Sequence, residues 1–230
     1  MARRPIIVFA AIGIVAYAVA MLATAPAGLL FRNTPQRTGV AGTIWAGEAG
    51  LAGGLRLAWQ MAPLRSLTSL GFAADWSANG TGTDLRGRML VHPGGRVVLD
   101  KVAGAADGTL LQALQPDLPF TCTMPMQLAF DRIAVHGGER AIVGRAQTEP
   151  GSCRARRGGV DTPVPALAIE AQRLGTHSQI RIVPATQRRR TLVRFDLAGD
   201  GRLAIEATPD GVTTLPFLGL PPGARIEAGL

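Results

Sequence analysis

The sequence has few charged residues, few aromatic residues and few of the residues that commonly carry out chemistry. Charged side chains make up 17% of the 230 residues and aromatic ones 5%, with one tyrosine, three histidines and two cysteines. The chain contains no Gly-x-Ser-x-Gly, no His-Glu-x-x-His and no phosphate-binding loop. The low charge does not indicate disorder, because apolar residue types reach 47%.

The histidines are too far apart in sequence to suggest a site. His92, His136 and His177 each lie beside an expected turn, with no carboxylate or cysteine at metal-ligand spacing. We therefore expect no catalytic, cofactor-binding or metal-binding residues, and we predict that the protein is not an enzyme. A Ser-His-Asp group assembled from distant segments is the alternative.

Long apolar runs are equally scarce, and the only one lies near the N-terminus. No charged residue occurs from Pro5 to Phe31, directly after Arg3 and Arg4. Roughly 20 apolar residues are enough for a transmembrane helix, whereas the apolar part of a signal peptide usually has about 7 to 15. This length favours an uncleaved membrane anchor. The alternative is a long signal peptide, since Ala23-Thr24-Ala25 and Ala25-Pro26-Ala27 resemble cleavage sites.

The anchor sets the predicted organisation of the chain. The positive-inside rule keeps the first residues in the cytoplasm and sends the remainder across the membrane. Because no second apolar block is long enough to span a bilayer, we expect the remainder to fold as one exported domain. The predicted parts are a cytoplasmic tail (1–4), a transmembrane anchor (5–30), a tether (31–38) and a periplasmic β domain (39–230).

The exported part contains short segments separated by glycine-rich turns. Between residues 193 and 197 apolar and polar residues alternate, which is typical of strands with one buried face. Helix is expected only at 109–119, and 165–175 is predicted to be a strand. The fold class is therefore mainly β, an N-terminal transmembrane helix followed by a curled antiparallel sheet of about ten short strands. The expected turns are Asn79-Gly80, 92–95, 136–139 and Asp200-Gly201.

Two of the three tryptophans lie close together in a stretch rich in glycine and leucine, residues 42–67. Ile44 and Trp45 are predicted to lie on one short strand, and residues 51–59 on the next. Tryptophans on strands bury large areas, so we interpret Trp45 and Trp59 as structural. A partner surface that includes them and Pro63 is the alternative.

These motifs carry a resemblance to a known family. Residues 42–47, Gly-Thr-Ile-Trp-Ala-Gly, followed by Leu57-x-Trp59-x-x-x-Pro63-Leu64, resemble the N-terminal part of general secretion pathway protein N of type II secretion systems. The segments LLQALQPDLPF and CRARRGGVDT are similar to the middle region of that family. The resemblance covers about residues 1–175 and is absent from the C-terminal segment.

The resemblance implies a non-enzymatic subunit that supports protein export across the outer membrane. It implies a single pass through the bacterial inner membrane, a cytoplasmic N-terminus and a periplasmic β domain. The implied partners are the inner-membrane platform, the outer-membrane secretin and inner-membrane lipid. The alternatives are a periplasmic lipid-handling protein with an apolar β groove and, ranked lower, a periplasmic hydrolase.

The basic residues of the exported part gather in two clusters. The net charge is +8, to which Arg3 and Arg4 contribute two. Nucleic-acid binding fits poorly with export and with a single tyrosine, so we expect no nucleic acid. We interpret the clusters as solvated loop charges, and contact with anionic lipid or an acidic partner is the alternative. The clusters are Arg154, Arg156 and Arg157, and Arg188, Arg189 and Arg190.

The two cysteines, Cys122 and Cys153, are predicted to form a disulfide. An oxidising periplasm permits the bond. In addition, a hairpin turn centred between Gly137 and Gly138 places the two cysteines directly opposite each other on antiparallel arms. The alternative is a pair of buried free thiols.

Overall fold

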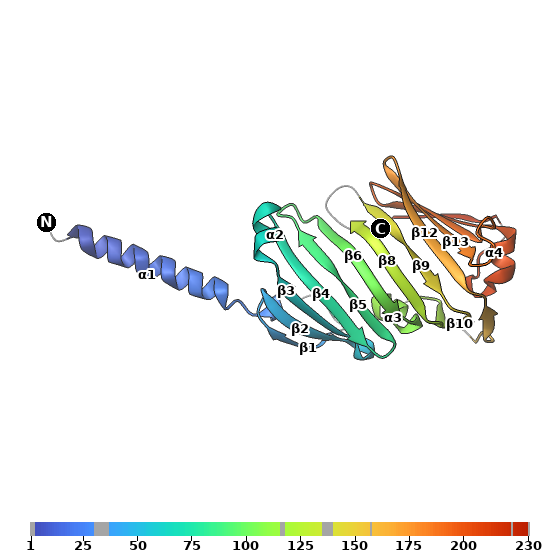
Figure 1. Ribbon diagram of the computed structural model, residues 1–230, viewed down its shortest axis with the longest axis horizontal. Coiled ribbons are helices and arrows are strands. Elements are labelled where there is room, and N and C mark those ends of the chain that lie inside the picture. The colour runs from blue at the N-terminus through green and yellow to red at the C-terminus, as the bar shows by residue number, and fades with distance from the viewer. Residues whose placement is uncertain are drawn as a thin grey trace.

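The chain is mainly β, as predicted, with strands accounting for 54% and helices for 20%. Helix α1 (Arg3–Ala23) projects away from the β domain (Figure 1). The predicted tail (1–4) and tether (31–38) lie largely outside the described residues. The computed structural model describes residues 3–29, 37–115, 118–134, 140–156, 158–221 and 223–229.

Within the described residues, thirteen strands form one antiparallel sheet in which neighbours follow almost in chain order. In spatial order they are β1 (Arg37–Gly42), β2 (Ala46–Leu51), β3 (Arg56–Met61), β4 (Phe72–Gly80), β5 (Thr83–Val91), β6 (Val97–Ala106), β8 (Met126–Ala134), β9 (Ala141–Thr148), β12 (Leu167–Leu174), β13 (His177–Pro184), β14 (Val193–Ala198), β15 (Arg202–Ala207) and β16 (Arg225–Gly229).

The sheet is open, so the predicted curled sheet of about ten strands is wrong in both shape and number. In the part of the chain that the structure describes, β1 and β16 are the two edges and do not pair with each other. Curvature of a sheet is produced by bulges and glycine kinks. The described ladders shift register only between β1 and β2, β5 and β6, and β8 and β9. The predicted number of strands was too low because the shorter strands lack a clear alternation of apolar and polar residues.

A small second sheet and three short α-helices complete the domain. Strands β7 (Phe120–Thr123), β10 (Gly151–Ala155) and β11 (Thr162–Val164) pair antiparallel around the central β10. The helix expected at 109–119 is confirmed as α3 (Gly108–Leu114), and the strand expected at 165–175 is confirmed as β12. The remaining helices are α2 (Pro63–Thr68), α4 (Pro209–Thr214), η1 (Ala27–Leu29), η2 (Ala52–Gly54) and η3 (Pro216–Leu218).

The strand register divides the large sheet into an apolar face and a polar face. On one face Trp59 pairs with Trp76. The same face carries the pairs Met89 with Leu99 and Ile180 with Phe195. The residues between them point the other way, and there Arg88 pairs with Asp100 and Arg181 with Arg194. Alternation along each strand thus places apolar side chains on one face from β3 to β15.

The predicted turns are confirmed at 92–95 and at Asp200-Gly201, which join β5 to β6 and β14 to β15. The β4–β5 hairpin also forms, but its turn is Thr81-Gly82 rather than Asn79-Gly80, because Gly80 still pairs with Thr83. Gly82 has a φ of +73°, and a Cβ there would overlap the Asp107 carboxylate. The turn expected at 136–139 lies outside the described residues.

The strands predicted around the tryptophans are only partly correct. Ile44 and Trp45 form a bend between β1 and β2 instead of a strand. The strand predicted over 51–59 is interrupted by η2, in which Gly53 has a φ of +82°, and β3 begins at Arg56. Positive φ angles of this kind favour glycine and end a strand.

Helix α1 is 21 residues long. Within the described residues, no helix combines the length and the hydropathy that crossing a bilayer requires. The anchor predicted over 5–30 is therefore not confirmed and stays a prediction.

Candidate binding surface

A junction of several contacts joins the end of α1 to the β domain. The indole Nε1 of Trp45 donates a hydrogen bond to the carbonyl of Leu22 at 2.8 Å. The backbone N–H of Ile44 donates to the carbonyl of Ala25 at 2.9 Å, and Pro26 forms a β-bridge with Thr43. The sheet therefore holds the end of α1 through both backbone and side-chain contacts.

Two glycines of the same motif permit the close packing below this junction. A Cβ on Gly47 would lie 2.6 Å from the carbonyl oxygen of Ala41 and 2.7 Å from the ring of Trp59. Gly42 has a φ of +89°, and a Cβ there would lie 2.5 Å from the carbonyl oxygen of Ala46. A larger side chain at either position would displace backbone, so the motif residues are required by this packing.

Trp59 is 7% exposed and packs against Ala27 and Ala49, which is the burial that the structural interpretation predicts. Its Nε1 donates to the carbonyl of Ile44 at 3.2 Å. Trp45 is only half-buried, and its ring lies 6.2 Å from the ring of Phe72, measured between centroids. Trp45 therefore links the end of α1 to the start of β4.

Helix α2 begins at Pro63, which occupies the first helical position and is exposed. Proline suits this position because its missing N–H has no partner there in any helix. The leucines that follow point into solvent, with exposed fractions of 81% for Leu64, 74% for Leu67 and 79% for Leu70. This exposed apolar tip was not predicted from the sequence, and it comes shortly before Phe72 in the chain.

The apolar sheet face opens into a groove across β3, β4, β5 and β6. Its volume is about 430 Å³, and every described side chain that lines it is apolar or aromatic. Small-molecule sites have volumes of roughly 300–1,000 Å³ and are lined mainly by such side chains. The lining residues are Leu57, Trp59, Phe72, Trp76, Met89, Val91 and Leu99.

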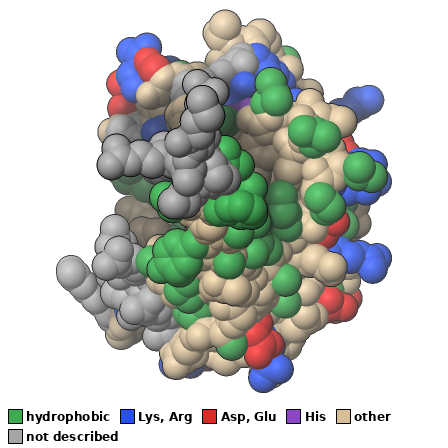
Figure 2. Space-filling model, turned by 90° about the vertical axis from the view of Figure 1, so that its left-hand side faces the viewer, with side chains coloured by type: hydrophobic (Ala, Val, Ile, Leu, Met, Phe, Trp, Pro, Cys, Tyr) green, Lys and Arg blue, Asp and Glu red, His purple; other side chains and the backbone are tan. Residues whose placement is uncertain are grey.

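The groove side chains are only partly covered by the described part of the chain. In the view from the side on which α1 projects, hydrophobic side chains, those of α1 among them, gather at the centre, while Lys, Arg, Asp and Glu side chains lie around the edge (Figure 2). Most groove side chains are half-buried; Trp59 alone is buried. The indole Nε1 of Trp76 is buried without an acceptor in the described part of the chain. The lipid-handling alternative predicted an apolar β groove but did not place it, although the alternation in β3, β4 and β5 was a usable signal for its position.

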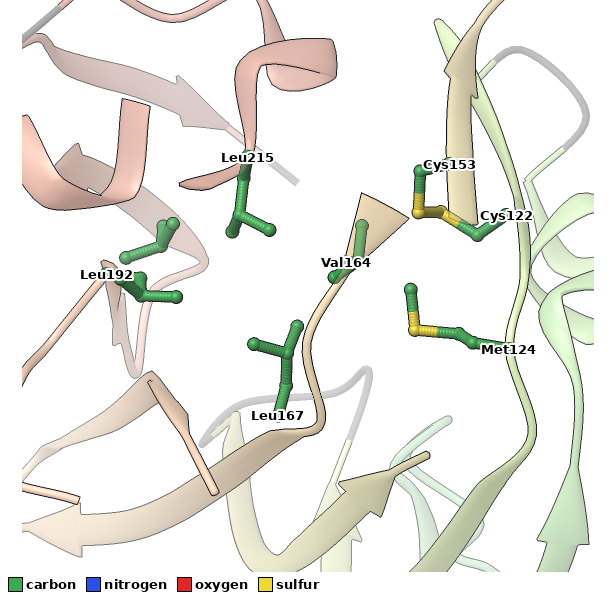
Figure 3. Packing of buried hydrophobic residues seen from close by; sticks show 8 residues of the cluster. Cys122, Met124, Cys153, Val164, Leu167, Leu192 and Leu215 are labelled. Atoms are coloured by element: carbon green, nitrogen blue, oxygen red, sulfur yellow. A yellow bond between two sulfur atoms is a disulfide. The ribbon is translucent and has the colours of Figure 1, made fainter. Parts of the chain in front are cut away.

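Elsewhere on the same face the apolar side chains are covered. Leu110 of α3 packs on Leu85, Ala106 and Met126 at one end of the neighbouring strands. Toward the C-terminal strands a larger cluster fills the space between the main sheet and the small sheet (Figure 3). Its buried members are Cys122, Met124, Cys153, Val164, Leu167, Leu192, Val193 and Leu215.

The disulfide between Cys122 and Cys153 is confirmed, with a Cα–Cα distance of 4.1 Å. The two residues are directly opposed, as predicted, on β7 and β10. These strands do not continue the β8–β9 hairpin of the main sheet; they belong to the small sheet. One register shift in the hairpin occurs between Phe130 and Arg132, and the opposition of the cysteines is nevertheless kept.

The arginine clusters are engaged in ion pairs with the chain's own carboxylates. The Nε of Arg154 donates to Asp161 at 2.9 Å, and the Nε of Arg190 donates to Asp210 at 2.7 Å. The hydrogen bond from Arg154 lowers the pKa of Asp161, and that from Arg190 lowers the pKa of Asp210.

The other members of the clusters are exposed or not described. Arg188 lies 3.8 Å from Glu170. Arg156 and Arg189 are exposed, and Arg157 lies outside the described residues. These contacts fit the solvated interpretation, and contact with lipid or an acidic partner stays a hypothesis.

The described histidines lie where the sequence placed them. His92 lies in the β5–β6 turn, and His136 lies outside the described residues. His177 begins β13 and lines an open hollow of about 560 Å³ on the C-terminal strands with Asp196, Arg202 and Glu227. Among the residues that the structure describes, no group of three or more His, Cys, Asp or Glu side chains is placed to hold a metal ion.

Comparison with known proteins yields no match to a family model, to a curated protein or to a solved structure.

Proposed function

We propose that this protein is a non-enzymatic, membrane-anchored subunit of a type II secretion system. One observation carries the proposal: the motif residues that resemble the family are the residues that build the α1 junction. Trp45 contacts Leu22, Trp59 packs on Ala27, and Gly47 admits the Trp59 ring. A fixed junction of this kind suits a subunit whose periplasmic domain must hold a defined position above the membrane.

The proposed location is the bacterial inner membrane, with a cytoplasmic N-terminus and a periplasmic β domain. Helix α1 supports this location because its apolar side chains are exposed, including Phe9 at 73%, Ile14 at 70% and Tyr17 at 68%. Exposed apolar surface of this extent marks a membrane or partner contact. The disulfide supports an oxidising compartment. The proposed partners are the inner-membrane platform and the outer-membrane secretin.

A second candidate function is lipid handling in the periplasm. The specific observation that favours it is the apolar groove of β3 to β6, which is open and lies next to the junction. Both candidates share the anchor and the lack of catalysis. They differ in the surface that is used: the apolar groove in lipid handling, and a partner-binding surface in secretion.

Deletion of the gene tests the secretion role. We expect export of the host's secreted enzymes to fall, and we expect the wild-type gene to restore it. A variant with the junction loosened by Gly47→Leu should be inserted in the membrane but restore export poorly. Normal export in the deletion strain, together with no chemical crosslink to a secretion component, would overturn the proposal.

A further inference from the structure

We propose that the groove formed by Leu57, Phe72, Trp76, Met89 and Leu99 binds the acyl chain of a membrane glycerophospholipid. The inference deepens the lipid-handling candidate by naming its ligand, and it does not depend on the secretion role. It does rest on the proposal that α1 lies in the membrane.

The side chains that line the groove favour an acyl chain as the ligand. The described side chains contain no charge, carboxamide or hydroxyl group that would orient a polar ligand or pair with the polar atoms of a protein partner. The groove crosses four adjacent strands, which corresponds to about 14 Å at the usual strand spacing. A long, narrow and wholly apolar ligand matches this shape, and its burial removes half-exposed apolar side chains from water.

The groove lies close to the proposed source of the lipid, the membrane around α1. Phe72 lies at one end of the groove, beside Trp45, and Trp45 is hydrogen-bonded to the end of α1. The exposed leucines of α2 and of the turn after it, Leu64, Leu67 and Leu70, come shortly before Phe72 in the chain. Two apolar elements with no protein cover in the described part of the chain therefore meet at the same end of the groove. With α1 in the bilayer, that end lies where an acyl chain leaves the lipid layer.

The Nε1 of Trp76 does not open into the groove. It is buried next to Gly87, without an acceptor among the described residues. An acyl chain would therefore contact only apolar ring atoms of this indole. The polar head group would remain outside the groove, in contact with water.

The test uses the full-length protein in vesicles of phosphatidylethanolamine and phosphatidylglycerol that carry a photoactivatable acyl chain. After illumination, mass spectrometry maps the labelled peptides. We expect label in β3 to β6 as well as in α1. Label confined to α1 and α2 would overturn the proposal, and so would a protein–protein crosslink between two copies through the groove peptides.

Two matched variants on β5 sharpen the test. Met89→Glu places a carboxylate inside the groove, and we expect labelling of β3 to β6 to fall about tenfold because a charge resists transfer to an apolar site. Arg86→Glu places the same group on the opposite face of the strand, between Ser77 and Ala103, and should leave labelling unchanged. Equal labelling of both variants would contradict the assignment. The labelling map of the wild-type protein tests the proposal even if Met89→Glu fails to fold. The result is independent of any secretion assay.

Discussion

The apolar face of the main sheet extends over both ends of the sheet, but it is covered at the C-terminal end and open at the N-terminal end. At the C-terminal end, the small sheet and the segment around α4 cover the face, and Leu192 and Val193 are 0% exposed. At the N-terminal end, Leu57, Met89 and Leu99 on the same face remain half-buried around an open groove. The covered end is a hydrophobic core, whereas the apolar side chains of the open end stay partly exposed in the described part of the chain.

The largest expected effect on stability is at Trp59, which is buried in a small core at the open end. Trp59→Ala should lower the free energy of unfolding by about 3 to 5 kcal/mol, because it leaves a large cavity next to Ala27 and Ala49. Trp76→Ala, at a half-buried position, should cost clearly less. Denaturant unfolding of the full chain in detergent measures both. If the two variants unfold alike, Trp59 is not the buried core of the open end.

The next effect concerns the covered end. Reduction of the Cys122–Cys153 bond should lower stability by roughly 3 to 4 kcal/mol, since the bond closes a loop with a sequence separation of 31. The emission of the groove tryptophans in the native reduced protein should not change. Unfolding with and without reductant, with free thiols blocked, provides the measurement. Unchanged stability would mean that the disulfide does not support this cover.

A smaller effect is expected at the α1 junction. Trp45→Phe keeps the ring next to Phe72 but removes the hydrogen bond to Leu22, with an expected cost of about 0.5 to 1.5 kcal/mol. Distances between spin labels on α1 and β3 should spread over a wider range. Trp76→Phe is the matched control, because its Nε1 has no acceptor among the described residues. Equal distance distributions for both variants would show that the hydrogen bond does not fix α1.

The smallest effect is a pH dependence at the covered end. Arginine hydrogen bonds lower the pKa of Asp161 and of Asp210 below the usual value. A lowered pKa adds stability above the unfolded-state value, near pH 4, and this stability is lost as the pH falls through the folded-state value. Melting temperatures should therefore be steady from pH 7 to about pH 5 and decline below about pH 4. Asp161→Asn with Asp210→Asn should make this decline shallower, and an identical decline would refute the assignment.

Local patterns in the sequence were sufficient for some features of the fold. The strand content, the helix near residue 110, the turns at 92–95 and 200–201, and the Cys122–Cys153 bond each depend on nearby residues or on hairpin symmetry. The Asn79-Gly80 turn was misplaced by two residues because Thr81-Gly82 is an equally acceptable turn sequence. Asp107, distant in sequence, occupies the space that a side chain at Gly82 would need.

The groove and the open shape of the sheet were harder to predict because they depend on what lies above the face. Alternation in β4 shows that Phe72 and Trp76 share a face, but not whether another layer covers them. At the covered end, Leu215 and Val164 come from segments far along the chain from the strands they cover. Long-range packing of this kind leaves no periodic signal in a single sequence.

Quenching of Trp76 fluorescence by brominated acyl chains measures whether an acyl chain occupies the groove. The chain has only three tryptophans, so Trp45→Phe with Trp59→Phe leaves Trp76 as the single reporter in the groove. The full-length variant, with its fold checked by circular dichroism, is compared in brominated and plain vesicles of phosphatidylethanolamine and phosphatidylglycerol. We expect lower Trp76 emission with brominated chains and recovery on adding Met89→Glu. Equal emission in both vesicles would contradict it.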